Sequence, residues 1–333
     1  MIDIIIPIYN TDKKVLLQCL SSIYMQTIID KITITLVDDG SSNKEYQEIL
    51  PFFNIQYNNI TLLEYKQNKG PAYARQFGLE HSSSPYIMFV DSDDALASPV
   101  AAQILLDIME TEGQKSVVVS GFYEVITNDY FIPHQTDLTW LFGKLYNRQF
   151  INLYNIKFYT KYRSNEDTGF NTCFRLCSSQ EWPIVNTDVI TYYWLNNNSN
   201  SITRKDNSSF LYGNGENDCF YGYCKNIEYA VEFAIQHNVN IDVIEFCAHH
   251  CLCAVYLHYI RGLAYAPDLA AEKIEMAKDF FNNIFKHFNY TINFRYLTEE
   301  FNLLKEKCYE EKELWKTALT FSLSDFISQI KRV

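Results

Sequence analysis

The first half of the chain alternates short apolar runs with stretches in which apolar residues recur at helical spacing. Ile2 to Ile8 is a nearly continuous apolar run, typical of a strand covered on both faces, and the apolar positions from Val15 to Ile23 then fall on one helical face. The strand signal returns at Ile32 to Val37, Ile60 to Tyr65 and Tyr86 to Val90. This β-α-β-α order predicts an α/β fold, with a doubly wound, mostly parallel sheet and helices on both faces.

The pattern changes further along the chain. The strand Ser116 to Gly121 and the aromatic, β-branched segment that follows it to Pro133 predict a hairpin, so that the sheet becomes mixed. Beyond Lys205 the apolar residues fall on single helical faces, which predicts a helical C-terminal domain. Because an Asn- and Ser-rich segment, Asn196 to Ser209, separates these regions, we expect one domain over residues 1–205 and another over residues 206–333.

Charge and composition argue against several classes of protein. The net charge of -12 at pH 7 gives no electrostatic reason to bind a nucleic acid backbone or an anionic membrane, although a local basic patch would change that. The first residues lack a basic leader followed by a long apolar core, and no apolar stretch reaches the roughly 18 to 20 uncharged residues of a spanning helix. We therefore expect a cytoplasmic protein without a transmembrane segment, whose cysteines are reduced and buried.

Polar residues follow three of the predicted strands, at the positions where an open α/β sheet binds its ligands. They are Pro7, Tyr9 and Asn10 after the first strand, Asp38 and Asp39 after the second, and Asp91-Ser92-Asp93-Asp94 after the fourth. Carboxylates crowded in this way repel one another unless a cation is present, and hard oxygen ligands suit Mg²⁺ or Mn²⁺ bound together with a diphosphate. Alternatively, one aspartate caps the next helix and the others are solvated. The position after a buried strand favours the metal site.

Six segments carry motifs in a fixed order. They are Ile4-Ile5-Ile6-Pro7-Ile8-Tyr9-Asn10, Leu36-Val37-Asp38-Asp39-Gly40-Ser41-Ser42, Asn68-Lys69-Gly70-Pro71-Ala72-Tyr73-Ala74-Arg75-Gln76-Phe77-Gly78, Phe89-Val90-Asp91-Ser92-Asp93-Asp94, Gly143-Lys144-Leu145-Tyr146-Asn147-Arg148 and Asn165-Glu166-Asp167-Thr168-Gly169-Phe170. Together they resemble the motifs of inverting family 2 glycosyltransferases, which have the Rossmann-like GT-A fold. Tyr192-Tyr193-Trp194 and Ser201-Ile202-Thr203 are similar to the strand and loop that close that domain. The resemblance covers residues 1–205, and the helical third carries no such motif.

The resemblance implies roles for individual residues. The donor nucleotide, most often a uridine diphosphate sugar in this family, is expected to contact Pro7, Tyr9, Asp39, Asn68, Gly70, Arg75, Asp91 and Ser92. Asp93, together with Asp91, is expected to bind Mn²⁺ or Mg²⁺, which stabilises the departing nucleoside diphosphate. Asp167, with Glu166 as the second candidate, is expected to take the proton of the acceptor hydroxyl.

The resemblance therefore implies an enzyme that adds one hexosyl or N-acetylhexosaminyl unit to a hydroxyl group of a glycan, cell-surface polymer or similar acceptor. Processive membrane synthases of the family carry a Gln-x-x-Arg-Trp motif, which this chain lacks. A sugar nucleotidyltransferase is disfavoured because Pro7 to Lys14 contains no glycine, and a non-catalytic binding protein because both acidic motifs are present. A DNA-modifying glycosyltransferase is disfavoured by the negative charge but not excluded. The sequence leaves open the donor sugar and base, the acceptor, the linkage and the oligomeric state.

The C-terminal third carries features with two interpretations each. One predicted helix is crowded with Cys247, His249, His250, Cys251 and Cys253, which suggests zinc, but Cys247 and Cys251 share an apolar stripe and are better explained as buried thiols. The amphipathic segment Phe321 to Val333 ends in a basic pair and could touch a membrane surface or pack on its own domain. The aromatic residues of this third could line an acceptor groove or join the helices in a homo-oligomer, although core packing explains most of them.

Overall fold

The computed structural model describes residues 1–127, 129–135, 138–195, 219–265, 267–307 and 312–331. The chain divides into two compact units, the first formed by Met1–Thr160 and Cys177–Asn198 and the second by Lys161–Leu176 and Ser199–Val333. The domain boundary expected near residue 205 and the loop around Ser201 lie outside the described residues. Helix α6 (Glu166–Cys177), which the sequence analysis includes in the first domain, groups almost entirely with the helices of the second unit.

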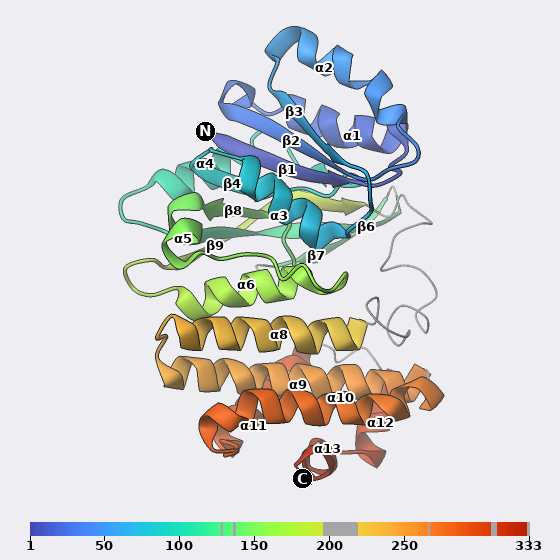
Figure 1. Cartoon of the computed structure of the whole chain (residues 1–333), viewed down its shortest axis with the longest axis vertical. Coiled ribbons are helices and arrows are strands. Elements are labelled where there is room, and N and C mark those ends of the chain that lie inside the picture. Colours follow the sequence, from blue (N-terminus) through green and yellow to red (C-terminus); the bar gives the residue numbers. More distant parts are fainter. Residues whose placement is uncertain (128, 136–137, 196–218, 266, 308–311, 332–333) are drawn as a thin grey trace. The chain divides into compact units, whose positions relative to one another are not determined.

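A mixed, nine-stranded sheet forms the centre of the first unit (Figure 1). Its strands are β1 (Ile2–Ile8), β2 (Ile32–Asp39), β3 (Ile60–Tyr65), β4 (Tyr86–Phe89), β5 (Ala95–Leu96), β6 (Val117–Thr127), β7 (Tyr130–His134), β8 (Lys144–Asn147) and β9 (Ile184–Leu195). They lie in the order β3-β2-β1-β4-β8-β6-β9-β5, with β7 paired to β6. β1 is parallel to β2 and β4, whereas β8 is antiparallel to β4 and β6, so the predicted change to a mixed sheet is confirmed.

Helices cover both faces of this sheet, as predicted. They are α1 (Lys13–Tyr24), α2 (Leu50–Tyr57), α3 (Pro71–His81), α4 (Ala101–Glu110) and α5 (Arg148–Tyr154). Side chains of α1 and α4 share one apolar core with Ile4 and Ile6 of β1. Because alternate residues of a strand point to opposite faces, Ile5 lies against α3, where a Cβ on Gly78 would come within 2.6 Å of the Ile5 side chain. Gly78 therefore allows α3 to pack close to the sheet.

Helices make up the second unit, as predicted for the C-terminal third. They are α6, α8 (Cys219–Gln236), α9 (Ile241–Tyr265), α10 (Pro267–Phe285), α11 (Phe294–Lys307), α12 (Lys312–Thr320) and α13 (Leu323–Ile330). α9 packs against α8, α10, α11 and α12. By length and composition Ile241–Ala264 would suffice to cross a membrane, but 72% of its most apolar window is buried within the structure. An apolar surface all round is expected of a helix surrounded by other helices.

The cysteines and histidines of α9 are used for packing. The eight cysteines that the structure describes are buried thiols, as predicted, and within the described ranges no group of three or more His, Cys, Asp or Glu residues could hold a metal ion. His249 is fully buried, its Nδ1 lies 2.7 Å from the carbonyl oxygen of Glu245, and its Nε2 accepts a hydrogen bond of 2.8 Å from the backbone N–H of Asn293. These contacts hold α9 to the segment before α11, so the structure gives no support to zinc binding there.

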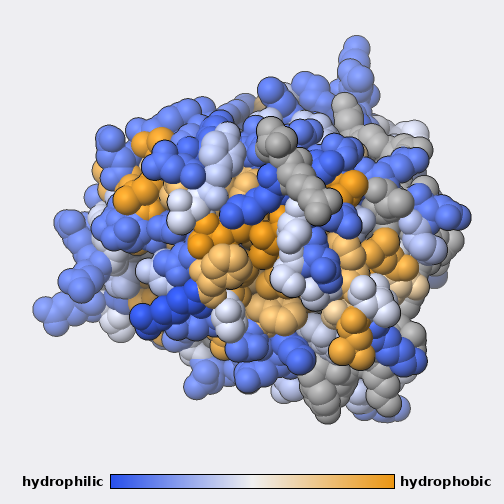
Figure 2. Space-filling view, turned by 90° about the horizontal axis from the view of Figure 1, so that it is seen from below, coloured by the Kyte–Doolittle hydropathy of each residue, from blue (hydrophilic) through white to orange (hydrophobic). Residues whose placement is uncertain are grey.

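The last helix packs on its own unit. Phe326, Ile327 and Ile330 of α13 are buried, and the hydroxyl of Tyr256 on α9 donates a 2.8 Å hydrogen bond to the carbonyl oxygen of Phe321. The apolar stripe of this segment is therefore used inside the chain, and contact with a membrane surface stays a prediction. Figure 2 shows apolar side chains gathered in the middle of the face seen from below in Figure 1, surrounded by hydrophilic ones. A homo-oligomer through the C-terminal helices also stays a prediction.

Candidate active site

The polar strand ends meet at one edge of the sheet. Ile8 of β1 lies beside Asp38 of the parallel strand β2, and Ile5 lies beside Phe89 of the parallel strand β4. The chain leaves all three strands in the same direction, so the loops after β1, β2 and β4 lie side by side. The carboxyl edge of the sheet therefore brings together the segments that the sequence singles out.

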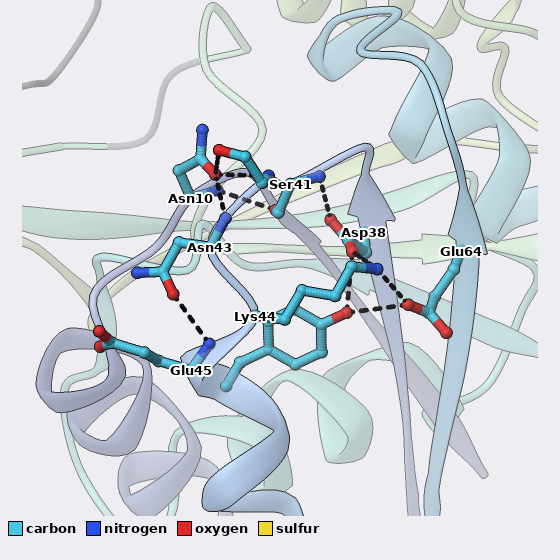
Figure 3. A network of polar contacts seen from close by, with 9 residues as sticks. Asn10, Asp38, Ser41, Asn43, Lys44, Glu45 and Glu64 are labelled. Atoms are coloured by element: carbon cyan, nitrogen blue, oxygen red, sulfur yellow. Dashed lines mark hydrogen bonds and ion pairs between the residues drawn. The ribbon is translucent and has the colours of Figure 1, made fainter.

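The loop after β1 is joined to the loop after β2 through Asn10 (Figure 3). Asn10 adopts a left-handed backbone conformation with φ of 49°, which asparagine tolerates better than most residues. Its N–H donates a 2.9 Å hydrogen bond to Ser41 Oγ, and its Oδ1 accepts hydrogen bonds of 2.9 Å from the N–H groups of Ser42 and Asn43. Tyr9 beside it is 52% exposed, so its ring is accessible to a planar ligand.

Asp38, at the end of β2, stabilises the same loop (Figure 3). Its carboxylate accepts hydrogen bonds from the Ser41 N–H at 2.8 Å, the Lys44 ammonium at 2.9 Å and the Tyr46 hydroxyl at 2.8 Å. Burial by itself raises the pKa of Asp38, but the hydrogen bonds from these three residues outweigh it and lower the pKa below the ordinary value. The lysine and the tyrosine also contact Glu64 of β3. Asp38 therefore shapes the loop and stays charged.

Asp39 holds the start of α3. It is 4% exposed, and its two carboxylate oxygens accept hydrogen bonds from the N–H groups of Lys69 at 2.6 Å and Gly70 at 2.9 Å. The chain passes close here, because a Cβ on Gly40 would lie 2.8 Å from the backbone nitrogen of Asn68. Gly40 and Gly70 also have positive φ, of 73° and 91°. The structure thus shows a backbone role for Asp39, and the nucleotide contact that the sequence predicts for it stays a prediction.

Two further contacts close a ring of hydrogen bonds around the edge. Arg75 on α3 is 6% exposed, and its guanidinium donates a 2.6 Å hydrogen bond to the Asp91 carboxylate. The hydroxyl of Ser92 lies 3.0 Å from that of Thr11, in the loop after β1. Each of the four segments at this edge is thus bonded to the next, and Arg75 is a buried partner of the acidic loop rather than a solvated helical residue. Thr11 was not among the predicted site residues.

The acidic tetrad divides into two parts. Asp94 is 2% exposed, and its carboxylate accepts hydrogen bonds of 2.7 Å from the Tyr192 hydroxyl and 2.8 Å from the Leu195 N–H. The oxygen of Tyr192 in turn accepts a 3.1 Å hydrogen bond from the N–H of Asp91. Burial raises the pKa of Asp94, as does repulsion from Asp91 and Asp93. Asp94 therefore ties β9 to the acidic loop, a role that the sequence analysis did not assign to Asp94 or Tyr192.

Asp91 and Asp93 are the two carboxylates of the tetrad that the sequence predicts as ligands of a cation. Both are partly exposed at the sheet edge, and one oxygen of Asp91 is already bonded to Arg75. Mg²⁺ and Mn²⁺ commonly take one or two protein carboxylates and complete their shell with water and substrate phosphates. Two aspartates on one turn fit such an ion when a diphosphate supplies further oxygens.

The predicted base lies in the second unit. Glu166 and Asp167 form the first turn of α6, where the helix dipole favours negative charge. Glu166 is 8% exposed, and Asp167 Oδ1 accepts a 2.8 Å hydrogen bond from the Thr168 N–H. The first unit thus holds the predicted nucleotide and metal residues, and the second holds both candidates for the base.

Comparison with known proteins agrees with this arrangement. Residues 3–168 match the family model described as glycosyl transferase family 2, which spans the sheet edge and the start of α6. The chain belongs to this family. Among relatives, it is 33% identical over 129 residues to the glycosyltransferase GlyG of Streptococcus pneumoniae, a match that covers 39% of this chain and 41% of GlyG. It is 34% identical over 127 residues to the minor teichoic acid biosynthesis protein GgaA of Bacillus subtilis, covering 37% of this chain and 28% of GgaA.

These matches span less than half the length of either relative.

A solved structure extends the likeness in fold. The crystal structure of S. aureus TarS 1–349 in complex with UDP-GlcNAc superposes with a TM-score of 0.66 at 15% identity, over 93% of this chain and 92% of that one. The chain therefore has the same fold as TarS, including the C-terminal helical region, for which the sequence carries no motif. The predicted GT-A fold is confirmed.

Proposed function

We propose that the chain is an inverting, metal-dependent glycosyltransferase that moves one sugar from a nucleotide-sugar donor to a hydroxyl group of a glycan or cell-surface polymer. The observation that carries this proposal is the ring of hydrogen bonds at the carboxyl edge of the sheet, which joins the acidic loop to Arg75 of α3 and to the loop after β1, and joins Asp39 to the start of α3. A site of this kind offers the aromatic ring of Tyr9, the buried guanidinium of Arg75 and the carboxylates of Asp91 and Asp93. A nucleoside diphosphate with a divalent ion matches these groups.

The nucleotide is assigned to the loops after β1 and β2 and to the start of α3. Tyr9 offers its exposed ring to the base, with Pro7 beside it, and Asp39 holds the turn at Gly70 from which α3 begins. Backbone N–H groups at a helix start, together with Arg75, attract a phosphate. Uridine diphosphate is the proposed nucleotide, and the UDP-GlcNAc bound by TarS supports it.

Asp91 and Asp93 would hold Mn²⁺ or Mg²⁺. When bound, the ion neutralises charge that grows on the diphosphate as it leaves. Ser92 is held by Thr11 and the Asp91 carboxylate by Arg75, so the acidic loop is held at two points before a ligand arrives.

Transfer itself needs one base. Asp167, or Glu166 in its place, takes the proton of the acceptor hydroxyl while the hydroxyl oxygen forms a bond to the anomeric carbon of the donor sugar. The bond from that carbon to the diphosphate oxygen breaks in the same displacement, and the nucleoside diphosphate leaves with the electron pair. A single displacement inverts the anomeric centre. GgaA, named for teichoic acid biosynthesis, supports a cell-surface polymer as the acceptor.

The first test is titration calorimetry with UDP, GDP, CMP and dTDP, each with Mn²⁺ and again with a chelator. We expect one diphosphate, UDP, to bind tightly only with the metal. Equal binding with chelator would contradict metal dependence, and preference for another nucleotide would replace the donor. No binding of any of them would contradict the proposed function.

A further inference from the structure

The turn before α6 is held by α8. Asn165 adopts a left-handed conformation with φ of 56°, and its side-chain amide donates a 2.8 Å hydrogen bond to the carbonyl oxygen of Cys219, the first residue of α8. The hydroxyl groups of Tyr162 and Tyr221 lie 3.3 Å apart, with the two rings edge to face. Glu166 follows this turn directly, so α8 contacts the backbone that leads into the predicted base.

Asn226 makes the central contact from α8. It is fully buried, and its side-chain amide donates hydrogen bonds of 3.1 Å to the carbonyl oxygen of Ser164 and 2.9 Å to that of Gly222. Both acceptors are carbonyl oxygens, so only the NH₂ group of the amide can face them. The bond to Gly222 lies within α8 and orients the amide, and the bond to Ser164 joins α8 to the main chain at residue 164.

Two glycines let the helices approach closely enough for these bonds. A Cβ on Gly169 of α6 would lie 2.6 Å from Asn226 Oδ1, and a Cβ on Gly222 of α8 would lie 2.1 Å from Ser164 Oγ. Both separations are far shorter than real Cβ contacts. The sequence therefore supplies glycine on α6 opposite Asn226, and on α8 opposite Ser164 in the turn before α6.

We propose that Asn226 is a positioning residue for the catalytic base, and that α8, with Gly222 and Gly169, orients the turn that presents Glu166 and Asp167. This inference rests on the proposed function, in which one of these two residues is the base. It assigns part of the catalytic machinery to a helix outside residues 3–168, the stretch matched by the family. The helical unit then contributes to the rate of transfer as well as to folding.

The test uses the full chain with the variant Asn226→Ala. We expect kcat to fall about tenfold or more, because a misplacement on the order of 1 Å can cost as much as 10²-fold in rate. The Kd for UDP with Mn²⁺ should stay within twofold, since the nucleotide residues lie in the first unit. Asn283→Ala is the matched control. It removes a partly buried hydrogen bond from Asn283 of α10 to Glu228 of α8 and leaves the contacts of the turn before α6 in place. Its kcat should stay within twofold of the parent.

An unchanged kcat in Asn226→Ala would overturn the inference, as would equal losses of kcat and melting temperature in both variants. If Asn226→Ala does not fold, Asn165→Gly takes its place, because glycine keeps the left-handed turn and removes the side-chain contacts of Asn165 with the carbonyl oxygen and the Sγ of Cys219. It should lower kcat with the UDP affinity intact, and a parent-like kcat would overturn the inference. An active Asp167→Asn and an active Glu166→Gln would instead contradict the proposed base itself, which separates the two failures.

Discussion

The carboxyl edge of the sheet and the first turn of α6 both present acidic residues, but they are held by different kinds of partner. At the sheet edge, Asp39 binds backbone 31 positions away and Asp91 binds an arginine 16 positions away, each inside a neighbouring motif. The turn before α6 is held by α8, over separations of 54 and 62 residues. The comparison teaches that the residues proposed for donor binding are held by neighbouring motifs, whereas the turn before the proposed base is held by a helix that carries no motif.

The largest effect should come from the base. Asp167→Asn removes the proton acceptor, and general base catalysis contributes about 10²- to 10⁴-fold to rate. We expect sugar transfer to fall by that factor while UDP binding in calorimetry is unchanged. Asp242→Asn, at the start of α9, is a control with the same change on another helix N-terminus of the unit. Full activity in Asp167→Asn would move the role to Glu166.

Asp93→Asn tests the other region of the comparison, the carboxyl edge of the sheet. The variant loses a proposed metal ligand at the sheet edge, and we expect UDP affinity with Mn²⁺ to weaken about tenfold, equivalent to about 1.4 kcal/mol. Binding measured with a chelator should not change. Asp107→Asn on α4 is the control, since Asp107 is an exposed aspartate outside the acidic loop and accepts a hydrogen bond from Gln103. Unchanged metal-dependent binding would remove Asp93 from the site.

Tyr192→Phe sharpens the comparison, because this tyrosine, like Thr11 with Ser92, contacts the acidic loop across a long separation, which is 101 residues in its case. The variant leaves the Asp91 N–H and the Asp94 carboxylate without the bridging hydroxyl. We expect the free energy of unfolding to fall by about 1 kcal/mol in chemical denaturation. Tyr193→Phe, next in the strand and on the other face of the sheet, should leave it unchanged. Equal effects in the two variants would argue against the bridge.

The smallest effect concerns pH and the helical unit. Burial lowers the pKa of His249 below its ordinary value of 6.5, so the native chain holds this ring neutral while the unfolded chain protonates it. The unfolded state therefore binds more protons below that value, and stability that is present at pH 7.5 is lost as the pH falls toward 5.5. Thermal unfolding of the parent and of His249→Gln at both pH values checks this. A pH response as large in His249→Gln as in the parent would exclude His249 as its source.

Much of the sheet unit could be predicted from sequence, because its strands are short apolar runs and its functional residues directly follow them. The strand order of β1, β2 and β4 brings Asp39, Asp91 and Ser92 together through parallel pairing alone. The sequence could not predict which polar residues of that edge bind a ligand and which bond to other parts of the chain. An aspartate has the same appearance in sequence whether it binds a ligand, as proposed for Asp93, or a buried tyrosine, as Asp94 does.

Less of the helical unit could be predicted from the sequence. Helical spacing predicts that its helices exist and which thiols are buried, because apolar periodicity is a local property. It does not show which helices are neighbours, so the grouping of α6 with α8, and the fit of Gly169 against Asn226, came only from the structure.

The sequence by itself determined the α/β fold, the order of the motifs and the identity of the acidic residues, since these depend on local spacing and on residue chemistry. Tertiary structure alone decided that Asp94 is tied to Tyr192, that Arg75 is buried against Asp91, and that α8 holds the turn before Glu166. The physical reason is that a hydrogen bond between distant segments depends on where packing places two backbones, and packing is a property of the whole folded chain.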